Sequence, residues 1–311
     1  MSLLQVKNLH TYFQFENSLI KAVRGVNFEV KEKETLAIIG ESGSGKSQIA
    51  LSILKLLQTN QKIVQGKIIF NQELISDFDE QQMRKIRGQE ISIIFQDPVS
   101  SLNPLLKIKT QIFEILKLRK GLYGKQALIQ AIKLLEQVEI SDPYKILESY
   151  PYQLSGGLCQ RVSIAISLIC RPKLLIADEP TTAIDVIAQK EILHLIKDMQ
   201  KKYNMSMIFI THDLSIVASL VENIIVLYKG MIVEKAPCKK IFSNPMHPYT
   251  KKLLNDFLLT SIYRSSIQPN ENFYNTENEV FDFRNFKNYA EPDLDLYQVS
   301  DEHFISCTLK K

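Results

Sequence analysis

Apolar and polar positions alternate along the chain in a way that predicts both buried strands and helices. Short, wholly apolar runs predict strands at "TLAIIG" (35–40), "LLIA" (174–177) and "MIFI" (207–210). Apolar residues spaced three or four positions apart predict helices over 48–57, 110–120 and 125–140. Continuous apolar strands are typical of a parallel sheet covered on both faces. The pattern therefore predicts an α/β fold, with a smaller helical subdomain inserted into the sheet domain.

The first predicted strand leads directly into a glycine-rich loop that suits phosphate. The stretch "GESGSGKS" (40–47) fits G-x-x-x-x-G-K-[ST], and a predicted helix follows it. Small residues let backbone N–H groups turn inward around phosphate oxygens, and the helix dipole adds to the attraction. The alternative is a Gly/Ser linker that matches by chance, which the predicted strand before the loop and the predicted helix after it disfavour. We expect phosphate contacts at Gly40, Glu41, Ser42, Gly43, Ser44, Gly45, Lys46 and Ser47.

Lys46 and Ser47 carry the chemistry of this loop. The Lys46 side chain can reach the β- and γ-phosphates of a nucleotide, and the Ser47 hydroxyl can ligate Mg²⁺.

Two adjacent carboxylates end the second predicted strand. Asp178 and Glu179 follow "LLIA", and acidic groups at the end of a buried strand are costly unless they meet a cation or transfer a proton. Asp178 suits a Mg²⁺ shell, and Glu179 can polarise an attacking water. The alternative is an acidic turn that caps the next helix, which we expect to start near Asp185. The phosphate loop upstream favours the catalytic interpretation.

The third predicted strand delivers Thr211, His212 and Asp213 at its end. A lone histidine is more often structural than catalytic, but open parallel sheets bind their ligands at the carboxyl ends of their strands. His212 can contact a γ-phosphate or orient the attacking water. The other four histidines have no such placement.

Composition narrows the partners and the compartment. A net charge of +4 is too small to indicate a nucleic-acid partner. The four cysteines show no CxxC spacing, which favours a reducing cytoplasm over a disulfide framework or a zinc site. The first residues lack the pattern of a secretory signal, and no apolar stretch is long enough to span a bilayer. If the protein works at a membrane, we expect it to dock on proteins that span it.

Five stretches together resemble the ATP-binding subunits of ABC transporters. They are the phosphate loop (Walker A in that family), "IIFQDP" (93–98), "LSGGLCQR" (154–161), "LLIADEPTTAID" (174–185) and "ITHD" (210–213). They occur in the family's order and at its usual separations, over about residues 3 to 250. The resemblance implies a P-loop NTPase core of the ABC ATPase type, with ATP and Mg²⁺ bound.

The signature stretch is the most specific of the five, because other P-loop proteins lack it. The resemblance implies that Leu154, Ser155, Gly156, Gly157 and Gln160 close on the γ-phosphate bound to a facing subunit. Two chains arranged head to tail would then enclose two ATP molecules. The physical chemistry agrees, since Ser155 offers a hydroxyl, the glycines allow close approach and a helix N-terminus faces the anion. Ser155 can also cap that helix, which does not exclude the other role.

The resemblance assigns further roles one residue at a time. Gln96 touches Mg²⁺ or the water and senses the transmembrane partner, so the Mg²⁺ set is Ser47, Gln96 and Asp178, and the catalytic set is Glu179, His212 and Gln96. Phe13 is the aromatic that stacks on adenine, with Tyr12 the less suitable choice and ordinary core packing the alternative. Asp185 communicates between the two sites of the dimer.

The domain organisation implied is a nucleotide-binding α/β core over 1–104 and 171–250, a helical subdomain over 105–170 that carries the signature, and a C-terminal extension over 251–311. In the family, the groove beside the helical subdomain receives a short cytoplasmic helix of the permease.

The stretches "FQDPVSSLNP" (95–104) and "NPMHPYTKKLL" (244–254) resemble the sequences of the dipeptide, oligopeptide and nickel importers. That branch implies peptide uptake, with nickel or a metal chelate as the alternative substrate. It also implies integral membrane permeases, a second and different ATPase chain, an extracytoplasmic binding protein, and a peripheral position on the cytoplasmic face of the inner membrane. A soluble ABC protein without a permease is a distant alternative, because the chain has one cassette and no sustained heptads. A module that binds ATP without hydrolysis is disfavoured by Glu179 and His212.

Three departures from the branch concern the tail, one surface turn and the two residues that follow "LSGG". Where the branch's tail holds an iron–sulfur cluster, this chain has Cys307 but Asn285 in place of another cysteine, so we expect no cluster. The tail is either a docking or regulatory flap or a remnant. Lys33 stands where glycine is common before Glu34, which affects only the turn. Leu158 and Cys159 replace a frequent Met-Arg pair, which affects coupling to the permease rather than a phosphate contact.

Overall fold

The computed structural model describes residues 1–16, 18–182, 184–265 and 296–306 of the 311-residue chain. The backbone divides into two compact units. Unit 1 is Met1–Asp77 with Phe209–Lys311, and unit 2 is Phe78–Ile208. The division falls inside strand β8 (Ser206–Thr211), so the two ends of the chain build one unit and the middle builds the other.

Unit 1 contains most of the strands. In its first segment the elements are β1 (Ser2–Gln14), β2 (Leu19–Lys31), β3 (Thr35–Ile39), α1 (Lys46–Ile53), β4 (Gln61–Phe70), β5 (Glu73–Leu74) and η1 (Ile75–Asp77). In its second segment they are α9 (Leu214–Leu220), β9 (Asn223–Tyr228), β10 (Met231–Pro237), α10 (Cys238–Ser243), α11 (Pro248–Ser265), β11 (Leu296–Ser300) and β12 (His303–Ser306).

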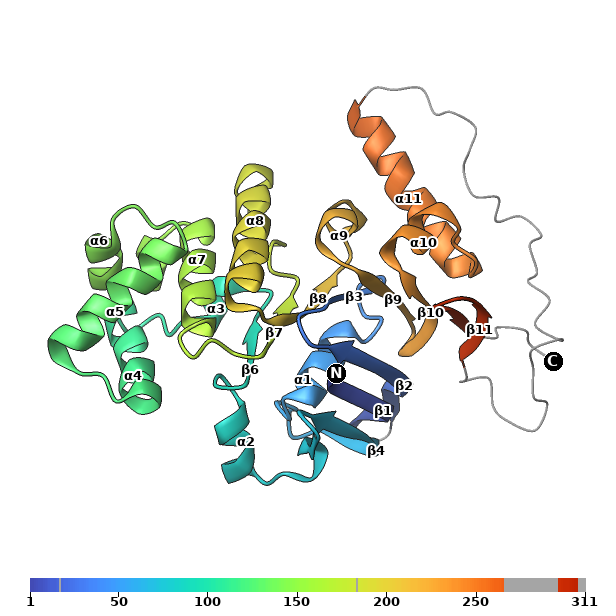
Figure 1. Ribbon diagram of the computed structural model, residues 1–311, viewed down its shortest axis with the longest axis horizontal. Helices are drawn as coiled ribbons and strands as arrows, with labels where there is room; N and C mark the ends of the chain where they lie inside the picture. The colour runs from blue at the N-terminus through green and yellow to red at the C-terminus, as the bar shows by residue number, and fades with distance from the viewer. Residues whose placement is uncertain (17, 183, 266–295, 307–311) are drawn as a thin grey trace. The chain divides into compact units, whose positions relative to one another are not determined.

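The strands of unit 1 form two groups (Figure 1). An antiparallel sheet has the order β2-β1-β4-β5, in which Leu4 of β1 pairs with Val30 of β2 and with Phe70 of β4. The second group has the order β11-β12-β10-β9-β3 and combines a parallel pair, β3 with β9, with antiparallel neighbours. Residue Ile38 of β3 lies opposite Ile225 of β9. Strand β3 is buried along its whole length, which is why its sequence is continuously apolar.

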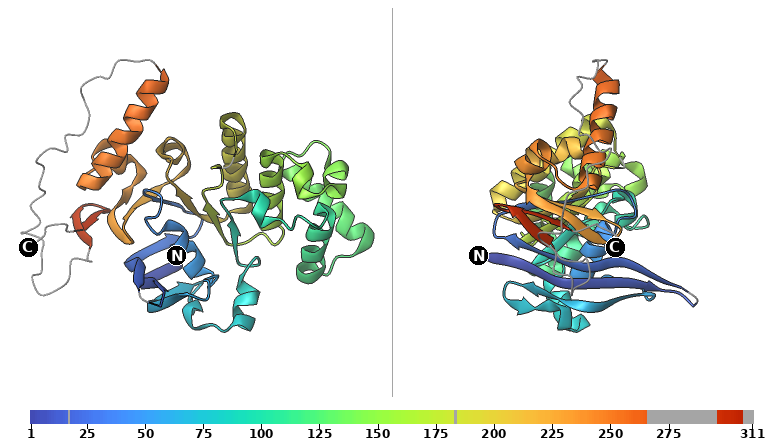
Figure 2. Two further views of the ribbon diagram at one scale, coloured as in Figure 1. Left: turned by 180° about the vertical axis from the view of Figure 1, so that it is seen from behind. Right: turned by 90° about the vertical axis from the view of Figure 1, so that its right-hand side faces the viewer.

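Unit 2 contains most of the helices. Its elements are α2 (Glu80–Ile86), β6 (Ile91–Ile94), α3 (Pro98–Ser101), α4 (Ile108–Lys120), α5 (Gly124–Gln137), α6 (Pro143–Glu148), η2 (Pro151–Gln153), α7 (Gly156–Ser167), β7 (Leu174–Asp178) and α8 (Val186–Tyr203). Strands β6 and β7 are parallel, with Ile93 opposite Ile176. Helices α4, α5 and α6 pack against one another, and α7 packs against α3, α5 and α8 (Figures 1 and 2).

Most of the local predictions are confirmed, and the fold class is α/β. The three predicted strands are β3, β7 and β8, and β7 is buried throughout. The predicted helices over 48–57, 110–120 and 125–140 are α1, α4 and α5, with somewhat different ends. The predicted helical subdomain over 105–170 lies wholly within unit 2, which also includes β6, β7 and α8.

The predicted C-terminal extension begins inside helix α11, which packs on α9 and β10 in unit 1 (Figure 2). The described part of the tail after α11 forms the hairpin of β11 and β12, and β12 pairs with β10 through Glu234 and Ile305. Asn285 and Cys307, on which the iron–sulfur argument rests, lie outside the described residues. Within the described ranges, every helix is too short or too polar to cross a bilayer. Lys33 adopts a φ of 63°, the left-handed geometry that explains why glycine suits this turn.

Candidate active site

The phosphate loop joins β3 to α1 and is shaped by close backbone packing. A Cβ atom on Gly40 would lie 2.2 Å from the carbonyl oxygen of Leu227, and one on Gly45 would lie 2.4 Å from that of Ala22. Gly45 also has a φ of 105°, so only glycine fits both the space and the backbone geometry. These two glycines therefore fix the path of the loop as it enters α1.

The Lys46 side chain is hydrogen-bonded to the first residues of the loop. The side chain is only 4% exposed, and its Nζ donates hydrogen bonds to the carbonyl oxygens of Gly40 and Glu41, each at 2.9 Å. The ammonium is therefore placed inside the loop before any nucleotide arrives. Ser47 follows it in the first turn of α1 and is half-buried.

The loop also offers an acceptor or donor that the rest of the described chain does not use. The Oγ atom of Ser44 is buried and has no hydrogen-bond partner among the described residues. A buried hydroxyl without a partner is unfavourable unless a ligand supplies one. The loop thus fits a polyphosphate, which brings acceptor oxygens to this position.

Two contacts from late in the chain support the loop, and the sequence analysis missed both. The backbone N–H of Gly230, in the turn between β9 and β10, donates to the Ser44 carbonyl at 2.8 Å. The backbone N–H of Glu41 donates to the phenol oxygen of Tyr249 at 3.0 Å. Tyr249 lies in the "HPYT" part of the 244–254 stretch, which in the sequence indicates only a branch of the family.

The two carboxylates lie at the end of β7 in unit 2. Asp178 is 6% exposed and Glu179 is 9% exposed. Glu179 has a φ of 47°, a left-handed conformation that a glutamate adopts only where the surroundings hold it. Its Oε2 accepts hydrogen bonds from Gln96 Nε2 and Thr182 Oγ1, both at 3.1 Å. The structure thus brings two of the predicted catalytic residues into direct contact and adds Thr182 to them.

The remaining predicted nucleotide residues belong to unit 1. His212 follows β8 and its side chain is exposed. Phe13 is half-buried on β1, and its ring stacks with that of Phe15 at a centroid distance of 6.4 Å. Tyr12 instead bonds to His10, with its hydroxyl 3.0 Å from Nδ1. The Phe13 ring therefore belongs to an aromatic pair with the exposed Phe15, and its adenine-stacking role stays a prediction.

The signature stretch begins helix α7. Ser155 caps the helix, because its Oγ accepts a hydrogen bond from the Leu158 backbone N–H at 3.3 Å. A cavity of about 350 Å³ beside it is lined by Ser155, Gly156, Gly157 and, from the start of α8, Asp185. Three of the five predicted signature residues therefore line one cavity within unit 2. Asp185, the predicted communication residue, lines the same cavity.

Asp185 has a structural role as well, at the position near which the next helix was expected to start. Its Oδ1 accepts a hydrogen bond from the Ala188 backbone N–H at 3.0 Å and caps α8. Leu154 is half-buried just before the helix. Gln160 lies a turn further along α7, is only 1% exposed, and has no partner for either amide atom among the described residues. The structure thus places Gln160 away from the cavity that the other signature residues line.

A buried polar cluster lies behind the phosphate loop in unit 1. The Glu234 carboxylate accepts hydrogen bonds from the backbone N–H groups of Met246 and His247, at 2.9 and 3.0 Å, and lies 2.6 Å from His303 Nε2. The Tyr249 backbone N–H donates to His247 Nδ1 at 3.1 Å. Burial lowers the pKa of His247 to about 4, against the opposing effect of the Glu234 charge. His247 is therefore neutral near pH 7 and able to accept.

This neutral, buried histidine predicts an acid-sensitive fold. The pKa of His247 is 6.5 when unfolded and about 4 when folded, so protons favour the unfolded chain as the pH falls between these values. We expect a loss of up to about 3 kcal/mol in the free energy of unfolding over this window. Urea unfolding of wild type and His247→Gln at several pH values measures it. Equal pH dependence in the two proteins would contradict the prediction.

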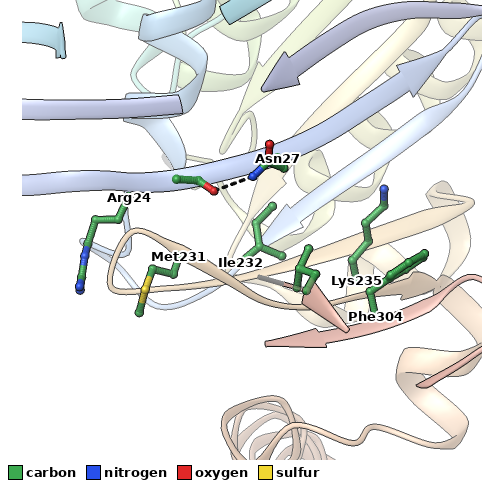
Figure 3. Close-up of a pocket in the computed structure, with 8 residues that line it drawn as sticks. Arg24, Asn27, Met231, Ile232, Lys235 and Phe304 are labelled. Atoms are coloured by element: carbon green, nitrogen blue, oxygen red, sulfur yellow. Dashed lines mark hydrogen bonds between the residues drawn. The ribbon is translucent and has the colours of Figure 1, made fainter. Parts of the chain in front are cut away.

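A further cavity of about 460 Å³ lies between β2, β10 and the C-terminal hairpin (Figure 3). Asn27 on one side donates to the Gly25 carbonyl at 2.9 Å. On the other side the Lys235 ammonium lies 5.8 Å from the ring centroid of Phe304. None of the predicted site residues lines this cavity, but the Lys235 contact helps to hold β12 against β10.

Comparison with known proteins agrees with this geometry. The ABC transporter family model matches residues 23–182. The oligopeptide transport ATP-binding protein AppD of Bacillus subtilis is 48% identical over 254 residues, covering 81% of this chain and 77% of AppD. The dipeptide transport ATP-binding protein DppD of Lactococcus lactis is 46% identical over 253 residues, covering 81% of this chain and 72% of DppD.

Solved structures give the same result. A dimeric ATP-binding cassette, MJ0796 bound to ADP and Pi, superposes with a TM-score of 0.68 at 30% identity, covering 76% of this chain and 98% of that one. The described strand–loop–helix with Lys46 and Ser47, and the carboxylates after β7, are the features of a P-loop NTPase. The chain belongs to the ABC transporter family and is one of its ATP-hydrolysing subunits.

Proposed function

We propose that this chain energises the uptake of dipeptides or oligopeptides by hydrolysing ATP. The observation that carries the proposal is the similarity to peptide-transport ATP-binding proteins, at 46–48% identity over four-fifths of the chain. Nothing in the described structure favours nickel or a metal chelate. We also propose the division into a nucleotide-binding core (1–104 and 171–250), a helical subdomain (105–170) and an extension (251–311).

In the proposed mechanism, the phosphate loop binds ATP through its backbone N–H groups and Lys46. Glu179 polarises the water that attacks the γ-phosphorus, and the hydrogen bonds from Gln96 and Thr182 aim its carboxylate. His212 holds the γ-phosphate and the water in place, and Phe13 stacks on adenine. Water attack and departure of ADP leave one phosphate, so the proton taken by Glu179 returns to product or solvent.

The loop's fit to a polyphosphate also supports Mg²⁺ binding. Ser47, Asp178 and Gln96 would hold the ion, since hydroxyl, carboxylate and amide oxygens are the ligands that Mg²⁺ prefers. When bound, it neutralises charge that develops on the phosphate oxygens.

We propose that the chain works in a head-to-tail dimer, with a second ATPase chain of different sequence. The signature cavity supports this arrangement, because Ser155 and the glycines line it at the N-terminus of α7, where an anion is favoured. In the dimer, Ser155, Gly156 and Gly157 close on the γ-phosphate held by the facing chain, and Asp185 connects the two sites. The matching cassette was solved as a dimer.

Membrane permeases are the partners that the helical subdomain suits. A groove of about 420 Å³ in unit 2 is lined by apolar side chains that include Phe95 just after β6, Ile115 of α4 and Ile166 of α7, together with polar side chains such as Gln111 and Glu114. We propose that a permease helix binds there, with the chain at the cytoplasmic face of the inner membrane. An extracytoplasmic binding protein delivers the substrate to the other side.

A glycine substitution separates the dimer contact from folding. A Cβ on Gly157 would meet only Ala188 Cβ, at 3.6 Å, an ordinary contact within the chain. We expect Gly157→Ala to keep the melting temperature of the isolated chain and to lower ATP turnover of the assembled transporter at least roughly tenfold, because the methyl group occupies the space of the facing γ-phosphate. Unchanged turnover would remove Gly157 from the facing site.

Uptake in cells that lack this gene tests the function. Labelled dipeptides, tripeptides and longer peptides are measured beside nickel, with the wild-type or the Glu179→Gln gene returned. Peptide uptake that only the wild-type gene restores supports the proposal. Intact peptide uptake with lost nickel uptake would mean that nickel is the substrate. The assignment as an ATPase would not change.

A further inference from the structure

One peptide group of the phosphate loop is held at both ends. The carbonyl of Gly40 and the N–H of Glu41 belong to the same planar unit. The carbonyl oxygen accepts a hydrogen bond from Lys46 Nζ at 2.9 Å, and the N–H donates to the Tyr249 phenol oxygen at 3.0 Å. In a trans peptide these two groups point in opposite directions, so a contact on one side fixes the direction of the other.

Tyr249 is itself held firmly. The residue is 9% exposed, and its ring lies 4.3 Å from the ring of Tyr228, centroid to centroid. Its backbone N–H is bonded to His247, whose own N–H is bonded to the fully buried Glu234 carboxylate. Burial also raises the pKa of the Tyr249 phenol, so the hydroxyl stays neutral near pH 7. A rigid support of this kind can constrain the loop that it contacts.

We propose that Tyr249 is a positioning residue for nucleotide binding, which holds the Gly40–Glu41 peptide group so that its carbonyl faces the Lys46 ammonium. The inference rests on the proposed binding of ATP at this loop. Without the phenol oxygen the Glu41 N–H loses its acceptor and the peptide group can rotate. The Lys46 ammonium then loses one of the two carbonyls that hold it, and ATP must restore the order of the loop when it binds.

The test replaces the hydroxyl and keeps the ring. Tyr249→Phe and, as a matched control, Tyr228→Phe each remove one phenol oxygen from the same aromatic pair. We expect Tyr249→Phe to raise the Kd of a fluorescent ATP analogue for the full-length chain roughly three- to tenfold, the size of one hydrogen bond. Tyr228→Phe should stay within about twofold. In membranes carrying the whole transporter, KM for ATP should rise by the same factor with kcat unchanged.

A double-mutant cycle with Lys46→Ala separates positioning from a general loss of structure. If Tyr249 acts through the carbonyl that faces Lys46, Tyr249→Phe should have no further effect on Kd once Lys46 is alanine. Equal effects in both backgrounds would overturn the inference. So would a Tyr249→Phe protein that binds within twofold of wild type.

Two further results separate the role of Tyr249 from ATP binding at the loop and from a folding defect. If Lys46→Ala leaves the Kd unchanged, ATP binding at this loop is wrong; if it weakens binding and Tyr249→Phe does not, only the role of Tyr249 is wrong. Should Tyr249→Phe fail to fold, hydrogen exchange on wild type decides. Protection of the Glu41 amide without nucleotide supports the contact, and an unprotected amide overturns it.

Discussion

Replacing Glu179 with glutamine is expected to stop ATP hydrolysis while leaving ATP binding intact. Glutamine has the same shape as glutamate but cannot take a proton from water at neutral pH. The loss of a positioned general base typically lowers turnover by 10²- to 10⁴-fold, and we expect roughly the upper part of that range. Because no nucleotide contact is assigned to Glu179, the Kd for ATP should stay within about twofold.

Two measurements check this expectation. Phosphate release by the assembled transporter gives kcat, and titration with a fluorescent ATP analogue gives Kd. Glu136→Gln is a matched control, because Glu136 is an exposed glutamate on α5 in the same unit. The Glu179→Gln protein should also accumulate as an ATP-bound dimer with the second ATPase chain in size-exclusion chromatography. Normal turnover in Glu179→Gln would remove Glu179 from its assigned role.

Replacing Lys46 with alanine is expected to weaken nucleotide binding itself. The substitution removes a buried ammonium that can bond to the β- and γ-phosphates, and charge-assisted hydrogen bonds are the strong ones. It also leaves the Gly40 and Glu41 carbonyls without the donor they have now. We expect the Kd for ATP to rise by roughly 10²-fold, which corresponds to about 2.7 kcal/mol.

The control for this variant is Lys62→Ala, which removes an exposed lysine from β4 of the same unit. Isothermal titration of both proteins with ATP gives the affinities, and thermal melting shows that both are folded. An affinity of Lys46→Ala within twofold of wild type would count against the phosphate loop as the binding site.

The features that sequence predicted well are local. The strand–loop–helix around Lys46 needs only adjacent residues, because glycine positions, the apolar run and helical spacing all lie within 35–57. The same holds for the Ser155 helix cap, which bonds to an N–H group three residues away, and for the start of α8 next to Asp185.

The features that sequence did not predict join distant residues. The Gln96 and Glu179 side chains meet across 83 positions, and Glu41 meets Tyr249 across 208. The burial of Gln160 also depends on packing, since α3, α5 and α8 surround α7. Gln160 was predicted to belong to the signature site because it lies in the motif. The geometry of α7 instead buries its side chain. The Glu234–His303 pair involves two charged or titratable residues with no local motif at all.

The division of unit 1 between the two ends of the chain has a consequence for synthesis on the ribosome. Glu41 emerges early, but Leu227, Gly230 and Tyr249, which shape and support the phosphate loop, are made about 190 to 210 residues later. At about 5–20 residues per second, that interval lasts roughly 10 to 40 seconds. During this time the nascent chain carries a Lys46 without its finished loop. The polypeptide therefore acquires its nucleotide site only after unit 2, the helical middle segment, has been synthesised.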